Sequence, residues 1–381
     1  MLNVNEDGEL AVVTWTGEGG ARPTTQRAEQ AYAALGPALA QRGMVPLQER
    51  VFADLAAMPC VSKGRARGLG AATEGSWSVP PTCVEGAPLG GHGLAGIHVL
   101  AARAEWTSPI ADSARVFGRV VDSPSARFVG LADVGRGAAG RLVPGPVEEA
   151  GAAIDAAVAL LEGEGFSFRD VVRTWFYLRD ILEWYGPFNA VRNAAFVRQG
   201  LLGRNGGSAI PASTGIEGRN ARGAWCTLDL LAVRPRAGAC FEMERLHSRR
   251  QNEATEYGSA FARGMSLTLG DQRYVFVSGT AAIDDHGATV HVGDFEAQVE
   301  HTLDAVTAVL ESAGAGLAHV RQATSFLKNP CDARAYDRIA GRTGLSDVPA
   351  VTTVADVCRE DLLFEIDATA VVPLGRGRSK G

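Results

Sequence analysis

Residues 210–233 read IPASTGIEGRNARGAWCTLDLLAV, and residues 348–371 repeat this pattern without a gap as VPAVTTVADVCREDLLFEIDATAV. The offset is 138 residues throughout, so that Pro211 falls on Pro349 and Asp229 on Asp367. Upstream, residues 148–180 and 298–329 match each other at an offset near 149. Because both matches occur in the same order, the chain contains two copies of one structural unit.

Both copies predict the same succession of elements. Apolar residues at three- and four-residue spacing indicate a first helix, and a glycine then marks its end. A strand rich in aromatic and β-branched residues follows. The expected elements are helices around 154–161 and 303–310, turns at Gly165 and Gly314, strands at 171–178 and 320–327, second helices over 185–200 and 333–342, and the closing strands.

The last closing strand alternates, with Phe364, Ile366 and Ala368 on one face and Glu365 on the other, with Asp367 and Thr369. We expect Glu365 to be buried. Burial without a partner raises the pKa of a carboxyl group and suits it to deliver a proton near neutral pH. The alternative is a structural acid that bonds a backbone turn.

The N-terminal part contains a weaker third copy. Residues 28–55 again read as helix, glycine and strand, but no closing strand is recognisable, and residues 60–98 look irregular. We therefore divide the chain into segments 1–110, 111–238 and 239–381. The predicted fold class is α/β (α+β), because β-α-β crossovers imply mixed sheets with helices packed on a face.

Composition excludes several classes of function. The chain has 381 residues, 46% of them hydrophobic, and no apolar run reaches the roughly 18 residues of a membrane span. The net charge of -6 argues against nucleic acid as a partner. The acidic start lacks the pattern of a secretory signal, so we expect a cytoplasmic protein.

Metal and cofactor motifs are not apparent in the sequence. The six cysteines and seven histidines are scattered, and the cysteines read as reduced thiols. The glycine-rich LGGHGLAG at 89–96 lacks a strand-turn-helix frame and is expected to be a flexible loop. We expect neither a metal nor an organic cofactor.

A family resemblance rests on four segments of the last unit. These are SGTA (278–281), LDAVTAVLESAG (303–314), FLKNP (326–330) and LLFEIDATAVV (362–372). In this order they resemble the RidA/YjgF superfamily. The resemblance covers residues 111–375 and part of 1–110, and it implies a chorismate-mutase-like fold whose single units often form trimers with clefts between neighbours.

Two branches of that superfamily compete. Its imine and enamine deaminases place an arginine two residues after the proline of the closing segment, where it binds a carboxylate. Here those positions hold Ser213 and Val351, which cannot make the bidentate charged contact. This counts against deaminase chemistry.

The chorismatase (FkbO-like) branch carries two units in one chain and cleaves chorismate to pyruvate and a cyclic acid. The segments VRTWFYL and AVRNAAFVR resemble this branch, and they put Arg173, Arg192 and Arg198 at its basic positions. DVCREDLLFEI resembles its segment bearing the catalytic acid, which falls on Glu365. Within the branch, a glycine and a cysteine at Gly279 and Cys358 imply formation of a hydroxybenzoate.

One motif departs from the branch. Chorismatases usually show Y-G-P-R-x-P-x-F-x-R, whereas residues 257–263 read YGSAFAR. The inner arginine, expected to hold a substrate carboxylate, is missing, while Tyr257 and Arg263 remain. The expected substrate is therefore chorismate or a related cyclic acid.

The resemblance and the residue patterns together define the candidate site. Cys358 is a pocket-shaping residue, a core residue or a nucleophile, and Lys328, whose copy is Arg179, lines the cleft mouth or is solvated. The expected catalytic residues are Glu365 and Cys358, and the expected substrate-binding residues are Gly279, Thr280, Tyr257, Arg263, Arg192, Arg198 and Lys328.

Three functional hypotheses follow. The first is a chorismatase-like enzyme of secondary metabolism that acts on chorismate or a related cyclic acid. The second is a diverged imine or enamine hydrolase, and the third is a non-catalytic protein that binds a small carboxylic acid. We expect the three segments to form a pseudo-threefold arrangement in one chain, as a monomer or a homo-oligomer, with the working cleft between the middle and last segments.

Overall fold

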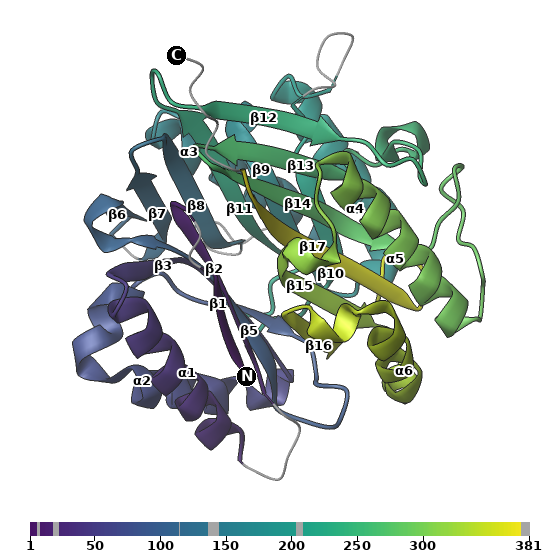
Figure 1. Ribbon diagram of the computed structural model, residues 1–381, viewed down its shortest axis with the longest axis horizontal. Helices are drawn as coiled ribbons and strands as arrows, with labels where there is room; N and C mark the ends of the chain where they lie inside the picture. The colour runs from purple at the N-terminus through teal and green to yellow at the C-terminus, as the bar shows by residue number, and fades with distance from the viewer. Residues whose placement is uncertain (6–7, 18–22, 114, 136–144, 203–208, 375–381) are drawn as a thin grey trace.

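Three β-sheets follow one another along the chain and are packed against each other (Figure 1). The computed structural model describes residues 1–5, 8–17, 23–113, 115–135, 145–202 and 209–374. Within these ranges, no helix combines the length and the apolar character that a membrane span requires.

The strands of each sheet are contiguous in sequence. The first sheet contains β1 (Leu2–Asn5), β2 (Leu10–Thr16), β3 (Met44–Ala53), β4 (Thr82–Glu85) and β5 (Leu94–Arg103). The second contains β6 (Thr107–Ala111), β7 (Val116–Asp122), β8 (Ala126–Gly135), β9 (Val171–Leu178), β10 (Ala212–Glu217) and β11 (Cys226–Pro235). The third contains β12 (Phe241–Leu246), β13 (Gly264–Leu269), β14 (Gln272–Ala281), β15 (Val320–Leu327), β16 (Ala350–Val354) and β17 (Phe364–Pro373).

All three sheets share one strand order. The first runs β1-β2-β5-β3-β4, and the same order recurs as β7-β8-β11-β9-β10 and as β13-β14-β17-β15-β16, with β6 and β12 as additional edge strands. In each sheet the last two strands of this order pair in parallel. The weak N-terminal echo is therefore a third complete copy of the unit.

The closing strand of the first segment, which was not recognised in the sequence, is β5. Residues 60–98 are not irregular, because they contain most of α2 (Met58–Glu74), all of β4 and the start of β5. The helix was not recognised because Gly64 and Gly68 of α2 have a low helix propensity. A Cβ atom at either position would overlap the backbone of α1 (Thr24–Ala40), so these glycines allow the two helices to approach closely.

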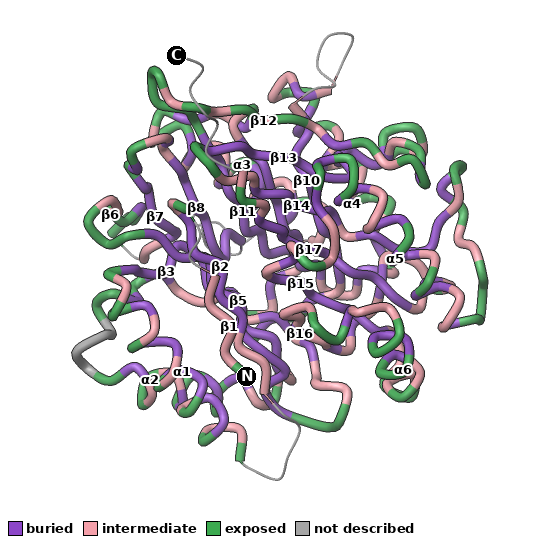
Figure 2. Tube along the Cα trace, in the orientation of Figure 1, coloured by how far each residue is buried: buried purple, intermediate pink, exposed green. Residues whose placement is uncertain are grey.

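Two helices cover the outer face of each sheet, and the inner faces meet. Helices α1 and α2 share a hydrophobic core with the first sheet. The second sheet is covered by α3 (Pro146–Gly163) and α4 (Ile181–Arg198), and the third by α5 (Phe295–Ser312) and α6 (Ala333–Thr343). Figure 2 shows buried strands in the middle and exposed helix faces outside. A common core joins all three sheets, with Leu47, Phe128 and Phe276 among its members.

The alternation predicted for the last closing strand is confirmed. Phe364, Ile366 and Ala368 pack under α5 and α6. Glu365 and Asp367 therefore point the other way, toward the neighbouring sheets, and both are buried. This inward face of β17 positions the candidate site.

Candidate active site

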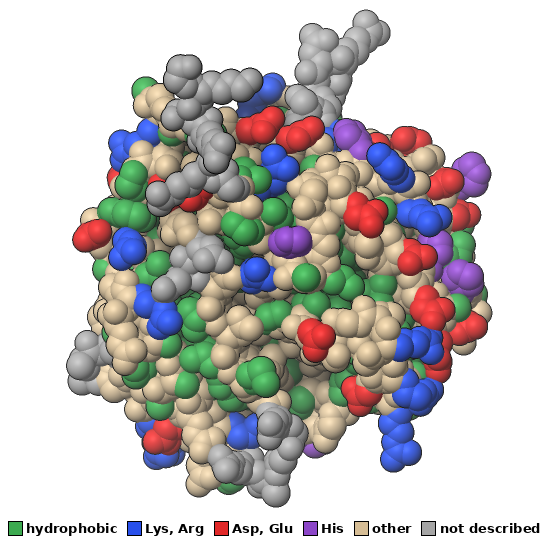
Figure 3. Space-filling model, viewed as in Figure 1, with side chains coloured by type: hydrophobic (Ala, Val, Ile, Leu, Met, Phe, Trp, Pro, Cys, Tyr) green, Lys and Arg blue, Asp and Glu red, His purple; other side chains and the backbone are tan. Residues whose placement is uncertain are grey.

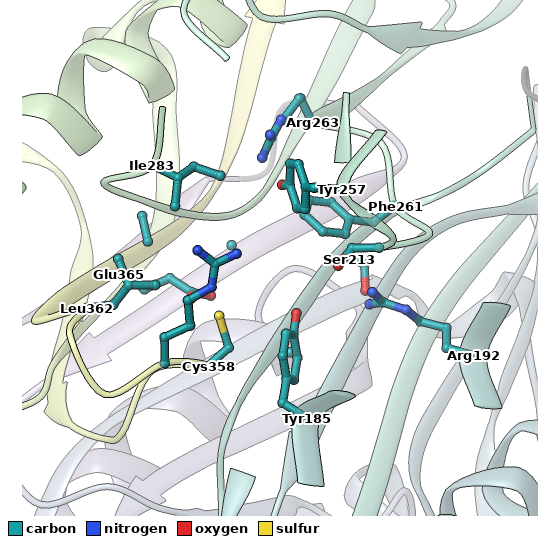
Figure 4. Close-up of a pocket in the computed structure, with 15 residues that line it drawn as sticks. Tyr185, Arg192, Ser213, Tyr257, Phe261, Arg263, Ile283, Cys358, Leu362 and Glu365 are labelled. Carbon is teal, nitrogen blue, oxygen red and sulfur yellow. The ribbon is translucent and has the colours of Figure 1, made fainter. Parts of the chain in front are cut away.

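A pocket opens between the second and third units, and Figure 4 shows its walls. It encloses about 520 Å³ between side chains, part of which is open to solvent. The second unit contributes Tyr185, Arg192, Ser213 and Gly215. The third unit contributes Tyr257, Ser259, Phe261, Arg263, Gly279, Ala281, Ile283, Cys358, Arg359, Leu362 and Glu365.

Glu365 is the one acidic residue among the described residues of this lining, and it lies on β17. Its side chain is buried, and its carboxyl makes no hydrogen bond or ion pair with the part of the chain that the structure describes. Burial raises the pKa of Glu365 to about 8, with a further rise from Asp367 and an opposing effect of Arg173. The group therefore carries a proton at neutral pH, as a general acid requires.

Gly279 faces Glu365 across an irregularity in the sheet. The pairing of β14 with β17 shifts register between Val277 and Thr280, and such bulges redirect side chains next to active sites. A Cβ atom at Gly279 would overlap Oε1 of Glu365 and would lie 3.3 Å from Cγ2 of Thr214. The glycine thus leaves room for the acid as well as for a ligand.

Cys358 lies in the same lining as Glu365 and Gly279. Burial raises the pKa of Cys358 to about 12, so that the side chain is a thiol and not the nucleophilic thiolate at neutral pH. Among the described residues of the lining there is no histidine that could activate it. These surroundings fit a residue that shapes the pocket.

Arg192 of α4 supplies a buried positive charge on the other side. Its side chain is 1% exposed, and its guanidinium carbon lies 5.2 and 5.5 Å from the ring centres of Phe188 and Phe261. One nitrogen donates to Asn189 Oδ1 at 2.6 Å. Among the described residues, Nε has no hydrogen-bond partner and the guanidinium has no carboxylate partner. A buried cation of this kind favours an anionic ligand.

Arg263 lies further along the wall, just before β13. It is buried, and its Nε and Nη2 both donate to the carbonyl of Asn252, at 2.9 and 2.6 Å. The ring of Tyr257 lies 5.4 Å from its guanidinium carbon. In Figure 4, Glu365 and Arg192 lie on opposite sides of the pocket, with Tyr185 and Tyr257 between them. A ligand there would meet an acid at one end and a cation at the other.

Several candidates lie outside this lining. Arg198 is exposed and pairs with Asp155 at 3.0 Å on the surface. Lys328 Nζ lies 3.4 Å from Asp356 Oδ1 and also donates to Glu360. Thr280 is buried, and its hydroxyl donates to the carbonyl of Ser278 at 2.8 Å.

Arg173, which the resemblance put at a basic position, is buried between the sheets and pairs with Asp367 at 2.9 Å. It does not line the pocket. Its positive charge is paired with the Asp367 carboxylate and does not face the pocket.

Sequence reasoning missed other wall residues, chiefly Tyr185 and Arg359. Arg359 follows Cys358 directly, and its Nη1 donates to the carbonyl of Gly287. Proximity to Cys358 was the available signal for Arg359, whereas Tyr185 reaches the pocket only through the path of α4. Within the described ranges, no three or more His, Cys, Asp and Glu side chains are grouped to hold a metal ion.

Comparisons with known proteins agree with this fold. The family model described as Endoribonuclease L-PSP matches residues 260–372. A RutC family protein of Synechocystis sp. is 33% identical over 103 residues, which are 26% of this chain and 79% of that protein. The chain therefore belongs to the RidA/YjgF superfamily, whose members share this structural unit.

Two further comparisons concern the arrangement of units. A solved chorismatase structure superimposes with a TM-score of 0.63 at 20% identity and covers 96% of this chain and 100% of its own, so the fold is that of a chorismatase. The 3-hydroxybenzoate synthase of Streptomyces hygroscopicus is 31% identical over 237 residues, or 55% of this chain. The match spans 65% of the length of that relative. The protein is thus a tandem-unit RidA-like protein similar to chorismatases.

Proposed function

We propose that the protein is a chorismatase-like enzyme. It cleaves the enolpyruvyl ether of chorismate, or of a related cyclic acid, into pyruvate and a hydroxybenzoate-type product in secondary metabolism. The observation that carries this proposal is the buried Glu365 opposite the buried Arg192 in one pocket. The names of the similar proteins, 3-hydroxybenzoate synthase and chorismatase, support the choice of substrate.

The chemistry uses Glu365 as a general acid. Its proton passes to the methylene carbon of the enol ether, which leaves an oxocarbenium ion and a Glu365 carboxylate. If water traps the ion, the resulting hemiketal loses its bond to the ring-bound ether oxygen, and pyruvate and a cyclohexadiene diol leave.

If a ring hydroxyl traps the ion, its proton returns to the Glu365 carboxylate and a cyclic ketal forms. The ketal carbon then loses its bond to the ether oxygen, and the ring loses its bond to the former hydroxyl oxygen, which leaves as the keto oxygen of pyruvate. The ring carbon that bears the ether oxygen gives up its proton, the freed phenol oxygen takes one up, and chorismate alone supplies all atoms of pyruvate and the hydroxybenzoate.

The arginines hold the substrate and orient it. Arg192 is the cation whose Nε is free among the described residues, and a guanidinium pairs well with a planar carboxylate. Arg263 is a second cation in the wall, with two of its nitrogens already on a carbonyl. We assign a substrate carboxylate to Arg192 and a supporting contact to Arg263. Gly279 and Cys358 shape the space for the ring.

Incubation of the protein with chorismate tests the proposal, with coupled detection of pyruvate and chromatography of the aromatic product. We expect stoichiometric pyruvate from the wild type and none above background from Glu365→Gln. Absence of pyruvate at high concentrations of the folded wild type would refute the proposal. Ammonia release from amino-acid-derived imines should be negligible, because Ser213 and Val351 cannot replace the deaminase arginine.

Ligand binding distinguishes catalysis from simple recognition. Under our proposal, Glu365→Gln still binds a non-reactive cyclic dicarboxylate, measured by calorimetry, but does not turn over chorismate. A wild type that binds chorismate without converting it would favour the hypothesis of a small-acid-binding protein.

A further inference from the structure

Asp367 lies two residues after Glu365 on β17 and on the same face of the strand. Its carboxylate accepts hydrogen bonds from three side chains of the second unit. The donors are Arg173 Nη2 at 2.9 Å, Trp175 Nε1 at 3.0 Å and Thr214 Oγ1 at 2.8 Å. We call Arg173, Trp175 and Thr214 the donor cage of Asp367.

The donor cage is deeply buried and crosses the boundary between units. Arg173 is 1% exposed, and its Nε and Nη1 have no hydrogen-bond partner among the described residues. Burial lowers the pKa of Arg173 to about 10, which still leaves it charged at neutral pH. Because its one ion pair within the described ranges is with Asp367, loss of that carboxylate would leave a buried charge uncompensated.

The second unit provides an internal comparison. Asp229 occupies the place of Asp367 in the repeat and accepts from Thr82 Oγ1 at 2.7 Å, just as Asp367 accepts from Thr214. Its surroundings differ otherwise. Its Oδ2 has no hydrogen-bond partner in the described part of the chain, and burial raises the pKa of Asp229 to about 7.

The residues around Asp229 and Asp367 differ between the second and third units, and so does the residue at the position of Glu365. Gln48 stands in β3 where Arg173 stands in β9, and it donates to two main-chain carbonyls instead of the aspartate. Thr227 stands where Glu365 stands in the last unit. Thus the copy that lacks the acid also lacks the arginine of the donor cage.

We propose that Asp367 is a positioning residue for Glu365. Its donor cage fixes the Asp367 side chain beside Glu365 through three hydrogen bonds, one of them within the ion pair with Arg173, and this arrangement favours the protonated form of Glu365. The consequence of this inference for catalysis rests on the proposed function. The effect of Asp367 on the protonation of Glu365 is measurable without any substrate.

The physical basis is repulsion between like charges in a buried setting. Two neighbouring carboxyl groups do not both ionise readily, and the better-bonded one ionises first. Asp367 raises the pKa of Glu365, and the positive charge of Arg173 opposes this effect less strongly. The other ionisable groups at the pocket are Cys358, Arg359, Tyr185, Arg192, Tyr257 and Arg263.

The experiment compares Asp367→Asn with Asp229→Asn, which changes the equivalent residue of the other copy. Isotope-edited infrared spectroscopy follows the carboxyl band that disappears in Glu365→Gln, as a function of pH. We expect Asp367→Asn to lower the titration midpoint of Glu365 by about one pH unit or more. Asp229→Asn should leave it in place. An unchanged midpoint in folded Asp367→Asn would overturn the inference.

A milder pair of variants covers the case in which Asp367→Asn does not fold. Thr214→Val removes one donor from the cage, and Thr82→Val is its matched control at Asp229. We expect the Glu365 midpoint to fall by several tenths of a pH unit in Thr214→Val alone. Equal midpoints in both variants would overturn the inference.

The kinetic readout separates this inference from the proposed function. Because the acid must be protonated, kcat/KM for chorismate should fall on the alkaline side, and that limb should move to lower pH in Asp367→Asn. A shifted infrared midpoint without any chorismate turnover would refute the proposed function alone. Turnover with an unshifted alkaline limb and midpoint would refute the role of Asp367 alone.

Discussion

Glu365 keeps its proton in the folded protein at some expense of stability. Its pKa is raised to about 8 in the folded chain, whereas the ordinary value is 4.5. Between these values the folded state binds more protons at this site than the unfolded state does. By linkage, the contribution of Glu365 to stability therefore decreases as pH rises from about 4.5 to about 8.

Replacement of the acid should remove this dependence. In Glu365→Gln, we expect the free energy of unfolding to increase relative to the wild type as pH rises from 5 to 8, with a slope of at most about 1.4 kcal/mol per pH unit. Urea denaturation at several pH values measures it. A difference between the two proteins that stays constant over this range would contradict the assignment of a protonated Glu365.

Gly279 gives a second prediction at the scale of a residue. In Gly279→Ala, the new methyl group would overlap the Glu365 carboxyl, which is the movable end of a side chain, so the acid should turn aside. We expect kcat to fall roughly 100-fold, as for a catalytic group misplaced by about 1 Å, with little change in Tm.

The control for this variant is Gly341→Ala on α6, where a Cβ would meet no atom within 4 Å. A large loss of Tm with unaltered kinetics would show that the glycine serves the backbone instead. The backbone gives no reason for such a need, because Gly279 is not among the glycines with positive φ.

Glu365, Gly279 and Cys358 were predictable because they lie in local segments that resemble the chorismatase branch, and the structure brings all three to one pocket. The partners of Asp367 were not predictable. They lie 153 to 194 residues away on another sheet, and no local pattern reports such contacts.

At the scale of elements, the path of α4 decides which of its side chains reach the pocket. The helix is interrupted at Trp184, where φ is -145° and ψ is 15°, and it contains Pro187. Arg192 and Arg198 are six residues apart, or roughly 240° around a regular helix. Arg192 consequently points inward, while Arg198 is exposed.

These two arginines form a matched pair for mutation. Arg192→Met should raise KM for chorismate roughly 10- to 100-fold, since a charged hydrogen bond to the substrate is lost. Arg198→Met should leave the kinetics unchanged and alter stability by less than about 1 kcal/mol, because it removes only an exposed ion pair. Similar KM values for both variants would contradict the role given to Arg192.

Elements of the two full copies were predictable from the repeat, since apolar spacing marks their helices and β-branched residues their strands. The first unit was harder. Gly64 and Gly68 lie in the stretch that looked irregular, but they allow close contact between α1 and α2, and Gly96 in β5 avoids an overlap with Val351 of the third unit. The sequence alone does not distinguish a glycine that ends a helix or strand from one that allows a neighbouring segment to approach closely.

At the scale of the whole molecule, the three units already bury the faces that single units would bury by association. Of the large hydrophobic side chains in the described ranges, Met1, Val197 and Val292 are exposed. Figure 3 shows charged side chains of both signs distributed over the visible face. We expect a monomer near 40 kDa by light scattering. A stable homotrimer with sites built from different chains would contradict this expectation.

The location of the pocket between two units of one polypeptide has a genetic consequence. Where subunits share an active site, two inactive alleles that damage opposite walls can restore each other when they are expressed together. Here Arg192 and Glu365 stand on opposite walls but are encoded in one reading frame. Co-expression of an Arg192→Met allele with a Glu365→Gln allele should therefore give no complementation, and each gene copy contributes its own complete site or none.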